Sequence, residues 1–79
     1  MKYILFEDRG TDQFMIFSHL LRHADIARDV GAAQVISAGF VVFGEGGEVC
    51  CFGESSTLGV KSRGPADALR IFAENQVFP

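Results

Sequence analysis

Two histidines, His19 and His23, stand four residues apart in the first third of the chain. On a helix, residues at this spacing share one face, and two imidazoles placed in this way can hold one metal ion. A third ligand would be needed, and Cys50 or Cys51 is the nearest candidate of the right chemical type. No Cys-x-x-Cys pair and no glutamate at the metalloprotease position accompanies the histidines. We therefore interpret both as hydrogen-bonded residues at the edge of the core or of an interface, and we predict no metal and no cofactor.

The two adjacent cysteines suggest a second chemistry, a thiol nucleophile that is activated by an imidazole. Cys50 and Cys51 stand in an apolar segment, where a cysteine usually behaves as a small hydrophobic residue, and no oxyanion-hole motif lies near them. The sequence therefore favours a protein without catalysis of its own. The alternative is a metal or thiol enzyme that uses His19, His23 and Cys50 or Cys51.

The cysteines also bear on the compartment. Successive residues of a strand point to opposite faces, so Cys50 and Cys51 cannot easily form a disulfide with each other. Small secreted domains usually carry four or more cysteines, whereas this chain has two. Residues 2–6 resemble a strand rather than a signal peptide. We predict reduced thiols and a cytoplasmic protein.

A third candidate site stands ahead of the C-terminal helix. Two cations, a hydroxyl and free backbone N–H groups would meet at the start of a helix, where the helix dipole favours an anion. Such a corner would bind the phosphate or carboxylate of a small ligand through Lys61, Ser62, Arg63 and Gly64. The simpler interpretation is an exposed helix entrance whose charges keep an edge solvated.

Composition and spacing argue against several other functions. With 7 Lys and Arg against 10 Asp and Glu, and a net charge of −3, a large nucleic-acid-binding surface is not expected. No apolar run is long enough for a transmembrane helix, so no membrane partner is predicted. The segment from Gly53 to Ser62 differs from a P-loop, because five residues separate its glycines and Val60 stands where lysine is required.

Hydrophobic periodicity and turn residues indicate four strands and two helices in one domain that spans residues 1–79. The strands are expected at 3–6, 14–17, 34–43 and 48–52, with a bulge or a close approach at residues 37–39. Ser18 would cap a first helix over 19–30, and Gly31 would end it. A second helix would run from Pro65 to Asn75 and turn Ala68, Leu69, Phe72 and Ala73 toward the core, with Ile71 at the margin.

This order of elements predicts an α+β fold, a two-layer ββαββα domain whose antiparallel sheet carries both helices on one face. The strands, however, are apolar on both faces, whereas a solvated face should alternate apolar and polar residues. Because two short helices on one face leave the other uncovered, we expect that face to pack against a second copy of the chain. The predicted contacts are Met15, Phe17, Phe40 and Val42.

The alternative is a monomer in which the segment 53–64 and the C-terminal tail cover the second face. Without disulfides, a core of this size contributes only about 3–5 kcal/mol to stability, which favours association. The sequence thus predicts a small cytoplasmic homodimer that acts as a non-enzymatic binding or scaffold module, with another protein as a candidate partner. The competing hypotheses are the anion binder at residues 61–64 and the metal or thiol enzyme.

Overall fold

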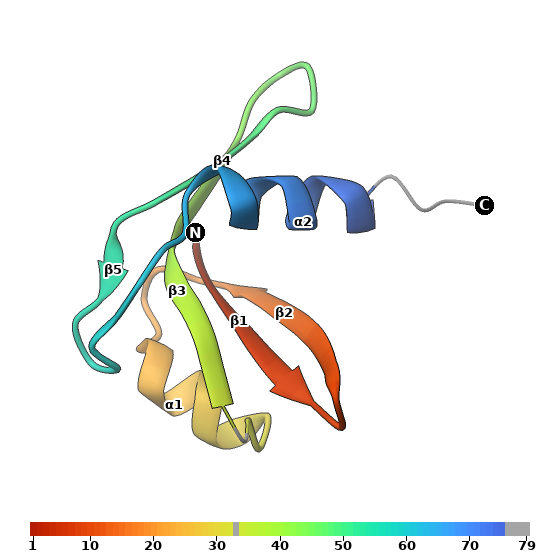
Figure 1. The fold of residues 1–79 in the computed structure, drawn as a ribbon. Coiled ribbons are helices and arrows are strands. Elements are labelled where there is room, and N and C mark those ends of the chain that lie inside the picture. Colours follow the sequence, from red (N-terminus) through yellow and green to blue (C-terminus); the bar gives the residue numbers. More distant parts are fainter. Residues whose placement is uncertain (33, 76–79) are drawn as a thin grey trace.

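The chain forms a four-stranded antiparallel sheet in the order β2-β1-β3-β4, with a two-stranded β5-β6 sheet and two helices (Figure 1). The computed structural model describes residues 1–32 and 34–75. The elements are β1 (Lys2–Asp8), β2 (Thr11–Phe17), α1 (His23–Asp29), β3 (Gln34–Phe43), β4 (Val49–Phe52), β5 (Glu54–Ser55), β6 (Val60–Lys61) and α2 (Pro65–Asn75). The predicted α+β class and antiparallel sheet are confirmed. No helix in the described part of the chain has the length and apolar character needed to cross a membrane.

The first hairpin follows from its turn. Arg9 and Gly10 both have positive φ, 56° and 80°, and they connect Asp8 to its register partner Thr11. A two-residue turn with φ above zero at both positions matches the right-handed twist of the flanking strands. It therefore fixes the register in which β2 lies against β1.

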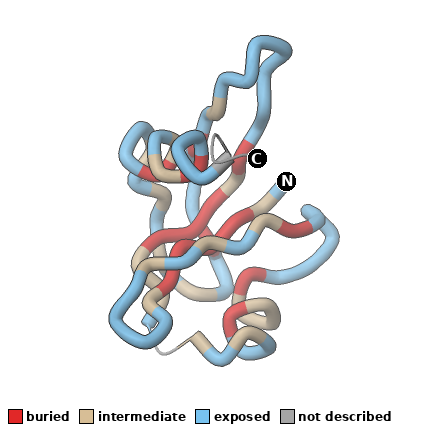
Figure 2. The backbone as a smooth tube through the Cα atoms, turned by 90° about the vertical axis from the view of Figure 1, so that its right-hand side faces the viewer, coloured by how far each residue is buried: buried red, intermediate tan, exposed pale blue. Residues whose placement is uncertain are grey.

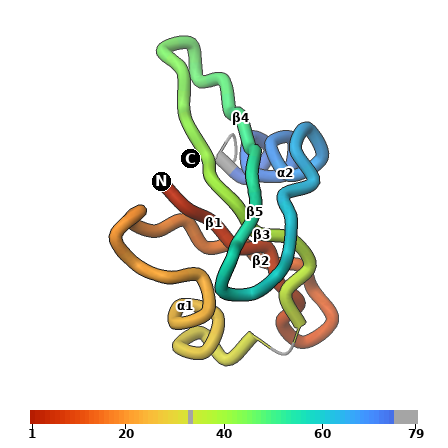
Figure 3. The backbone as a smooth tube through the Cα atoms, turned by 90° about the vertical axis from the view of Figure 1, so that its left-hand side faces the viewer, coloured from red at the N-terminus to blue at the C-terminus, as the bar shows by residue number. Residues whose placement is uncertain are grey.

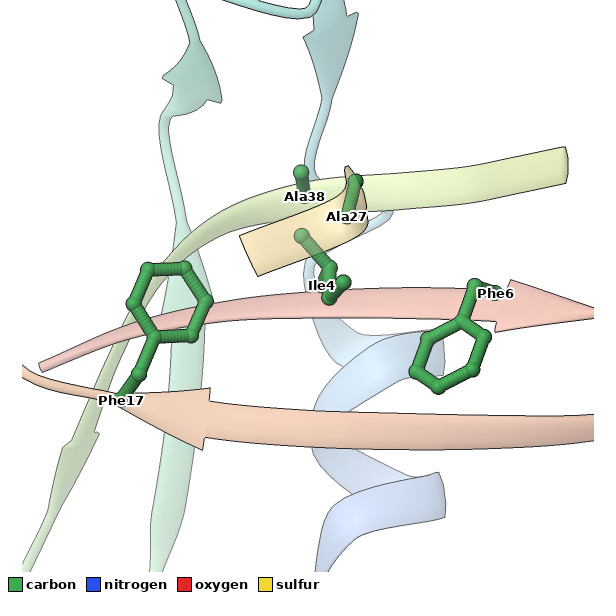
Figure 4. Close-up of a cluster of buried hydrophobic side chains, with 5 residues drawn as sticks. All are labelled: Ile4, Phe6, Phe17, Ala27 and Ala38. Carbon is green, nitrogen blue, oxygen red and sulfur yellow. The ribbon is translucent and has the colours of Figure 1, made fainter. Parts of the chain in front are cut away.

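The central strand β1 is buried on both faces, since four consecutive residues from Tyr3 to Phe6 are at most 7% exposed. Ile4 and Phe6 pack with Phe17, Ala38 and Ala27 of α1, and Figure 4 shows this cluster. Tyr3 points to the opposite face, where a second cluster joins it to Val41, Cys51 and Ile71 of α2. Each helix thus covers a different face of the sheet.

The predicted packing of both helices on one face is therefore wrong, and Figure 3 shows α1 and α2 on either side of the strands. The physical reason is the apolar character of β1 on both faces, which requires a cover on each side. One helix on each face satisfies this requirement within a single chain. The same pattern had suggested that a second copy covers the sheet.

The helix α1 is shorter than predicted and begins at His23 rather than His19. Ser18 does not cap it, because the Ser18 Oγ accepts the N–H of Leu20 at 3.1 Å and the Ser18 carbonyl accepts the N–H of Leu21 at 3.1 Å. These bonds close a local turn, an alternative that serine offers to a helix start.

The predicted end of the helix is confirmed. Gly31 has φ 68°, its N–H bonds to the carbonyl of Arg28, and the N–H of Ala32 bonds to the carbonyl of Ala27. This pair of bonds is the Schellman motif.

Gly39 of β3 lies at the predicted close approach. A Cβ atom at this position would lie 2.5 Å from the carbonyl oxygen of Phe52 and 3.0 Å from the Cβ of Ser62. The absence of a side chain therefore lets β4 and the segment that follows β6 pass against β3.

We expect Gly39→Ala to lower the free energy of unfolding by about 1–3 kcal/mol, because backbone atoms would have to move to admit the methyl group. Urea denaturation followed by circular dichroism measures the change. Gly46→Ala is the matched control, since a Cβ there meets only the flexible carboxylate of Glu48. If the two variants are equally stable, the packing at Gly39 is looser than described.

Candidate functional site

His23 is a buried structural residue and His19 is exposed ahead of the helix, so α1 does not present the two imidazoles together. His23 is 2% exposed, and its Nε2 lies 2.9 Å from the carbonyl oxygen of Gly39. Because a carbonyl can only accept, the Nε2 atom carries the proton and donates it. Burial lowers the pKa of His23 in spite of this bond. Across residues 1–32 and 34–75, no group of three His, Cys, Asp or Glu side chains is placed to hold a metal ion.

The two cysteines lie in different environments. Both thiols are free, with Cys50 exposed and Cys51 buried in the cluster beneath α2. Burial raises the pKa of Cys51 to about 11, so its thiol stays protonated at neutral pH and is a poor nucleophile. His23 packs against Phe17 on the α1 face, whereas Cys51 points to the α2 face.

Arg63, one of the residues of the predicted anion corner, is already bonded to a carboxylate of the chain itself. Asp67 is 1% exposed, and its Oδ2 accepts the Tyr3 hydroxyl at 2.5 Å and the N–H of Arg63 at 2.9 Å. Its Oδ1 accepts Nε–H of Arg63 at 2.9 Å. The Ser62 Oγ lies 2.7 Å from the Tyr3 oxygen and accepts the N–H of Gly64 at 2.9 Å. Asp67 thus fills the place at the start of α2 that an external anion would take.

Lys61 is the remaining member of that corner, and it is exposed in β6 opposite Glu54 of β5. Burial alone would raise the pKa of Asp67, but the hydrogen bonds from Tyr3 and Arg63 outweigh it and hold this pKa below its usual value. Of this corner, Arg63 is therefore bonded to an ionised internal carboxylate, Ser62 and Gly64 are linked to it through Tyr3, and Lys61 stands apart.

The outer strand β4 of the sheet belongs to a different kind of site. Val41 exchanges hydrogen bonds with Met1, since its N–H donates to the Met1 carbonyl at 2.9 Å and its carbonyl accepts the terminal amine at 3.2 Å. In an antiparallel pair these directions alternate along the strand. The residue opposite Val41 is Cys51, so the backbone groups of Cys51 and Val49 point away from β3. Cys51 is only 6% exposed, and a Cβ at Gly64 would lie 3.9 Å from its carbonyl oxygen, so only Val49 offers an accessible edge.

A cavity of about 630 Å³ opens between β4 and α2. Figure 2 shows the exposed end of the β3–β4 hairpin beside α2, above the buried strands. Leu69 is 70% exposed and Phe72 is 39% exposed, although both belong to an apolar helix face. The residues that line this groove are Glu48, Val49, Cys50, Cys51, Pro65, Ala68, Leu69 and Phe72. Its size is typical of ligand-binding clefts, and its walls are mainly apolar.

The orientation predicted for α2 is wrong. Ile71 and Asp67 enter the interior at 1% exposure each, Leu69 and Phe72 remain accessible, and Ala73 is exposed. The available signal was Asp67, whose carboxylate needs donors and so competes with the apolar residues for the interior. The apolar pattern alone therefore did not predict the groove.

The predicted interface residues lie on the α1 face of the sheet. Phe17 is 6% exposed and packs against His23, so it belongs to the core of the single chain. Phe40 is half-buried between His23 and Phe52. Met15 on β2 and Val42 on β3 are exposed, at 38% and 49%. These four residues do not form one accessible patch, and two of them, Phe40 and Val42, lie beside β4, opposite Phe52 and Cys50.

Comparison with models of protein families, with curated proteins and with solved structures finds no match to this chain.

Substituting Asp67→Asn tests whether its carboxylate stabilises the fold as a charge. Because the pKa of Asp67 is lower in the folded than in the unfolded chain, the folded state binds fewer protons. The stabilisation is complete above the unfolded pKa near 3.8 and is lost as the pH falls through the folded pKa. We expect Asp67→Asn to lower the free energy of unfolding by about 1–3 kcal/mol at pH 7, and by less below about pH 4.

Urea denaturation at several pH values measures this difference from the wild type. Asp29→Asn serves as the control, because Asp29 is exposed and lies 3.9 Å from the Arg28 guanidinium. A loss in Asp67→Asn that stays constant between pH 7 and pH 3 would contradict a stabilising charge.

The titration of His23 tests whether its imidazole is buried. We expect its titration midpoint to lie below about 6.5, the value of an unstructured histidine, because burial disfavours the imidazolium. We also expect the neutral ring to carry its proton on Nε2. Nuclear magnetic resonance of the ring protons and nitrogens measures both quantities, and a midpoint above 6.5 would rule out the buried neutral form.

Proposed function

We propose that this protein is a small binding module without catalysis of its own, and that the groove between β4 and α2 takes up an extended polypeptide segment. The observation that carries the proposal is an apolar groove beside the outer strand of the sheet. Val49 directs its backbone donor and acceptor away from β3, and Leu69 and Phe72 stand exposed across the groove. An added strand would use both features at once.

The geometry specifies what kind of segment fits. Its backbone would hydrogen-bond to Val49, whose donor and acceptor can pair with only one residue of the segment. Alternate side chains would point to the α2 face, where Pro65, Leu69 and Phe72 offer apolar contacts. The expected ligand is therefore a short extended segment with apolar residues at every second position.

The proposal includes no catalysis because the candidate catalytic side chains are buried or hydrogen-bonded within the chain. The Cys51 thiol is buried with a raised pKa, His23 donates to a backbone carbonyl, and Asp67 is bonded within the chain. The free thiols of Cys50 and Cys51 support a reducing, cytoplasmic compartment as part of the proposal.

Selection from a displayed library of random ten-residue peptides tests this function. We expect the selected peptides to carry alternating apolar residues, and Leu69→Glu to raise their Kd about tenfold or more. Fluorescence anisotropy of a labelled selected peptide measures the Kd. Glutamate suits an exposed helix position, so the fold should persist in this variant.

Leu20→Glu is the matched control, because Leu20 is 81% exposed and lies outside the groove. Peptide binding should be unchanged in this variant. A library that yields no binding peptide, or peptides that bind Leu69→Glu as tightly as the wild type, would contradict the proposed function.

A further inference from the structure

We infer that one aromatic side chain anchors the bound segment by inserting between β4 and α2 over Ala68, and that Ala68 thereby determines which segments the groove accepts. This inference rests on the proposed function, because it names the chemistry of the partner at the same groove. The anchor is a side chain, so it needs no access to the backbone of Cys51.

The residues that α2 contributes to the groove form a socket for one side chain. They follow the spacing i, i+3, i+4 and i+7, and they are Pro65, Ala68, Leu69 and Phe72. Residues at this spacing are neighbours on one side of a helix and enclose a hole between them. In coiled coils, a four-residue hole of this kind takes a single apolar side chain from the facing helix. The same packing can hold one side chain of a bound segment.

The inner side of this socket has the least side-chain bulk. Ala68 is half-buried and packs against the core cluster beneath α2, whereas Leu69 on the outer side is 70% exposed. The strand closes one end of the groove, because Cys51 is only 6% exposed and a Cβ at Gly64 would lie 3.9 Å from its carbonyl oxygen. Beyond this contact the β3–β4 hairpin and α2 point in different directions (Figure 1). The groove is therefore closed at Cys51 and has room above the methyl group of Ala68.

An aromatic ring is the side chain that suits this socket best. Phe72 forms one end of the socket and is 39% exposed, so a bound ring can pack against it edge-to-face or offset. Aromatic pairs of this kind gain more than their buried area alone provides. Aromatic residues in well-packed pockets also carry much of the affinity of many interfaces. A cavity of about 630 Å³ can hold a ring together with the backbone that carries it.

The charge at the groove restricts the residues beside the anchor. Within the described part of the chain, Glu48 is the one charged residue that lines the groove, and it is exposed. Glu48 repels a carboxylate of the bound segment and attracts a lysine or an arginine, and salt screens both effects. We therefore expect neutral or basic residues, and no acidic residue, next to the anchor.

Peptides selected from the ten-residue library test the anchor. We expect them to share an aromatic residue at one position and to carry no acidic residue beside it. Replacing this aromatic residue by alanine should raise the Kd of the peptide for the wild type about 30-fold or more, as measured by fluorescence anisotropy. This change tests the anchor without altering the protein.

Ala68→Leu fills the socket from the side of the protein. We expect this variant to bind the aromatic peptide about tenfold or more weakly than the wild type does, and to bind the alanine-substituted peptide as tightly as the wild type does. The two changes are then not additive, because both remove the same contact. Leucine is a good helix former, and circular dichroism establishes that the variant is folded.

Ala73→Leu is the matched control, because Ala73 is exposed on the same helix and lies outside the groove. This variant should bind the aromatic peptide as the wild type does. Peptides that Leu69→Glu weakens, but that share no aromatic position, would overturn the inference and leave the proposed function in place. An aromatic peptide with the same Kd for Ala68→Leu and for the wild type would also overturn the inference. A library without any binding peptide would contradict both the inference and the proposed function.

Discussion

The buried carboxylate of Asp67 fixes the rotation of α2 about its own axis, and the accessible surface of the molecule depends on that rotation. A carboxylate can be buried only where donors surround it, and those donors come from Tyr3 of β1 and from Arg63. Ile71 follows Asp67 by four residues and therefore lies on the same side of the helix, where it fills the core. Leu69 and Phe72 are turned to the other side. The groove beside β4 is thus a consequence of how Asp67 is satisfied.

Local signals in the sequence predicted the elements well. Gly31 marked the end of α1 through its positive φ, and Pro65 marked the start of α2. Gly39 marked a close approach of backbones that the structure confirms. These features depend on one residue and its neighbours, so the sequence contains them directly. Ser18 was misleading for a related reason, because a serine closes a local turn as readily as it caps a helix.

The incorrect predictions concern which face of each helix packs against which face of the sheet. Amphipathic periodicity says that a helix has an apolar side, but it does not say which face of the sheet that side will cover. The apolar residues of α2 outnumbered Asp67 in the pattern, yet hydrogen bonding of one buried carboxylate decided the rotation of the helix. The dimer was predicted from the uncovered face of a sheet, and that premise is wrong since α1 and α2 cover one face each. What remains accessible is the apolar groove between β4 and α2.

The groups that first suggested chemistry are used to build the fold. The imidazole of His23 donates to the carbonyl of Gly39, which lies opposite Tyr3 of β1, and Asp67 accepts hydrogen bonds from Arg63 in the corner before α2. The Cys51 thiol fills space beneath α2. A chain of 79 residues has few polar groups that could serve both the fold and catalysis, because a buried polar group needs a hydrogen-bond partner. The backbone of Val49 in β4 points away from β3 beside the apolar groove instead, and such a site recognises another polypeptide segment rather than a small reactive molecule. This arrangement is the physical reason for preferring association over catalysis.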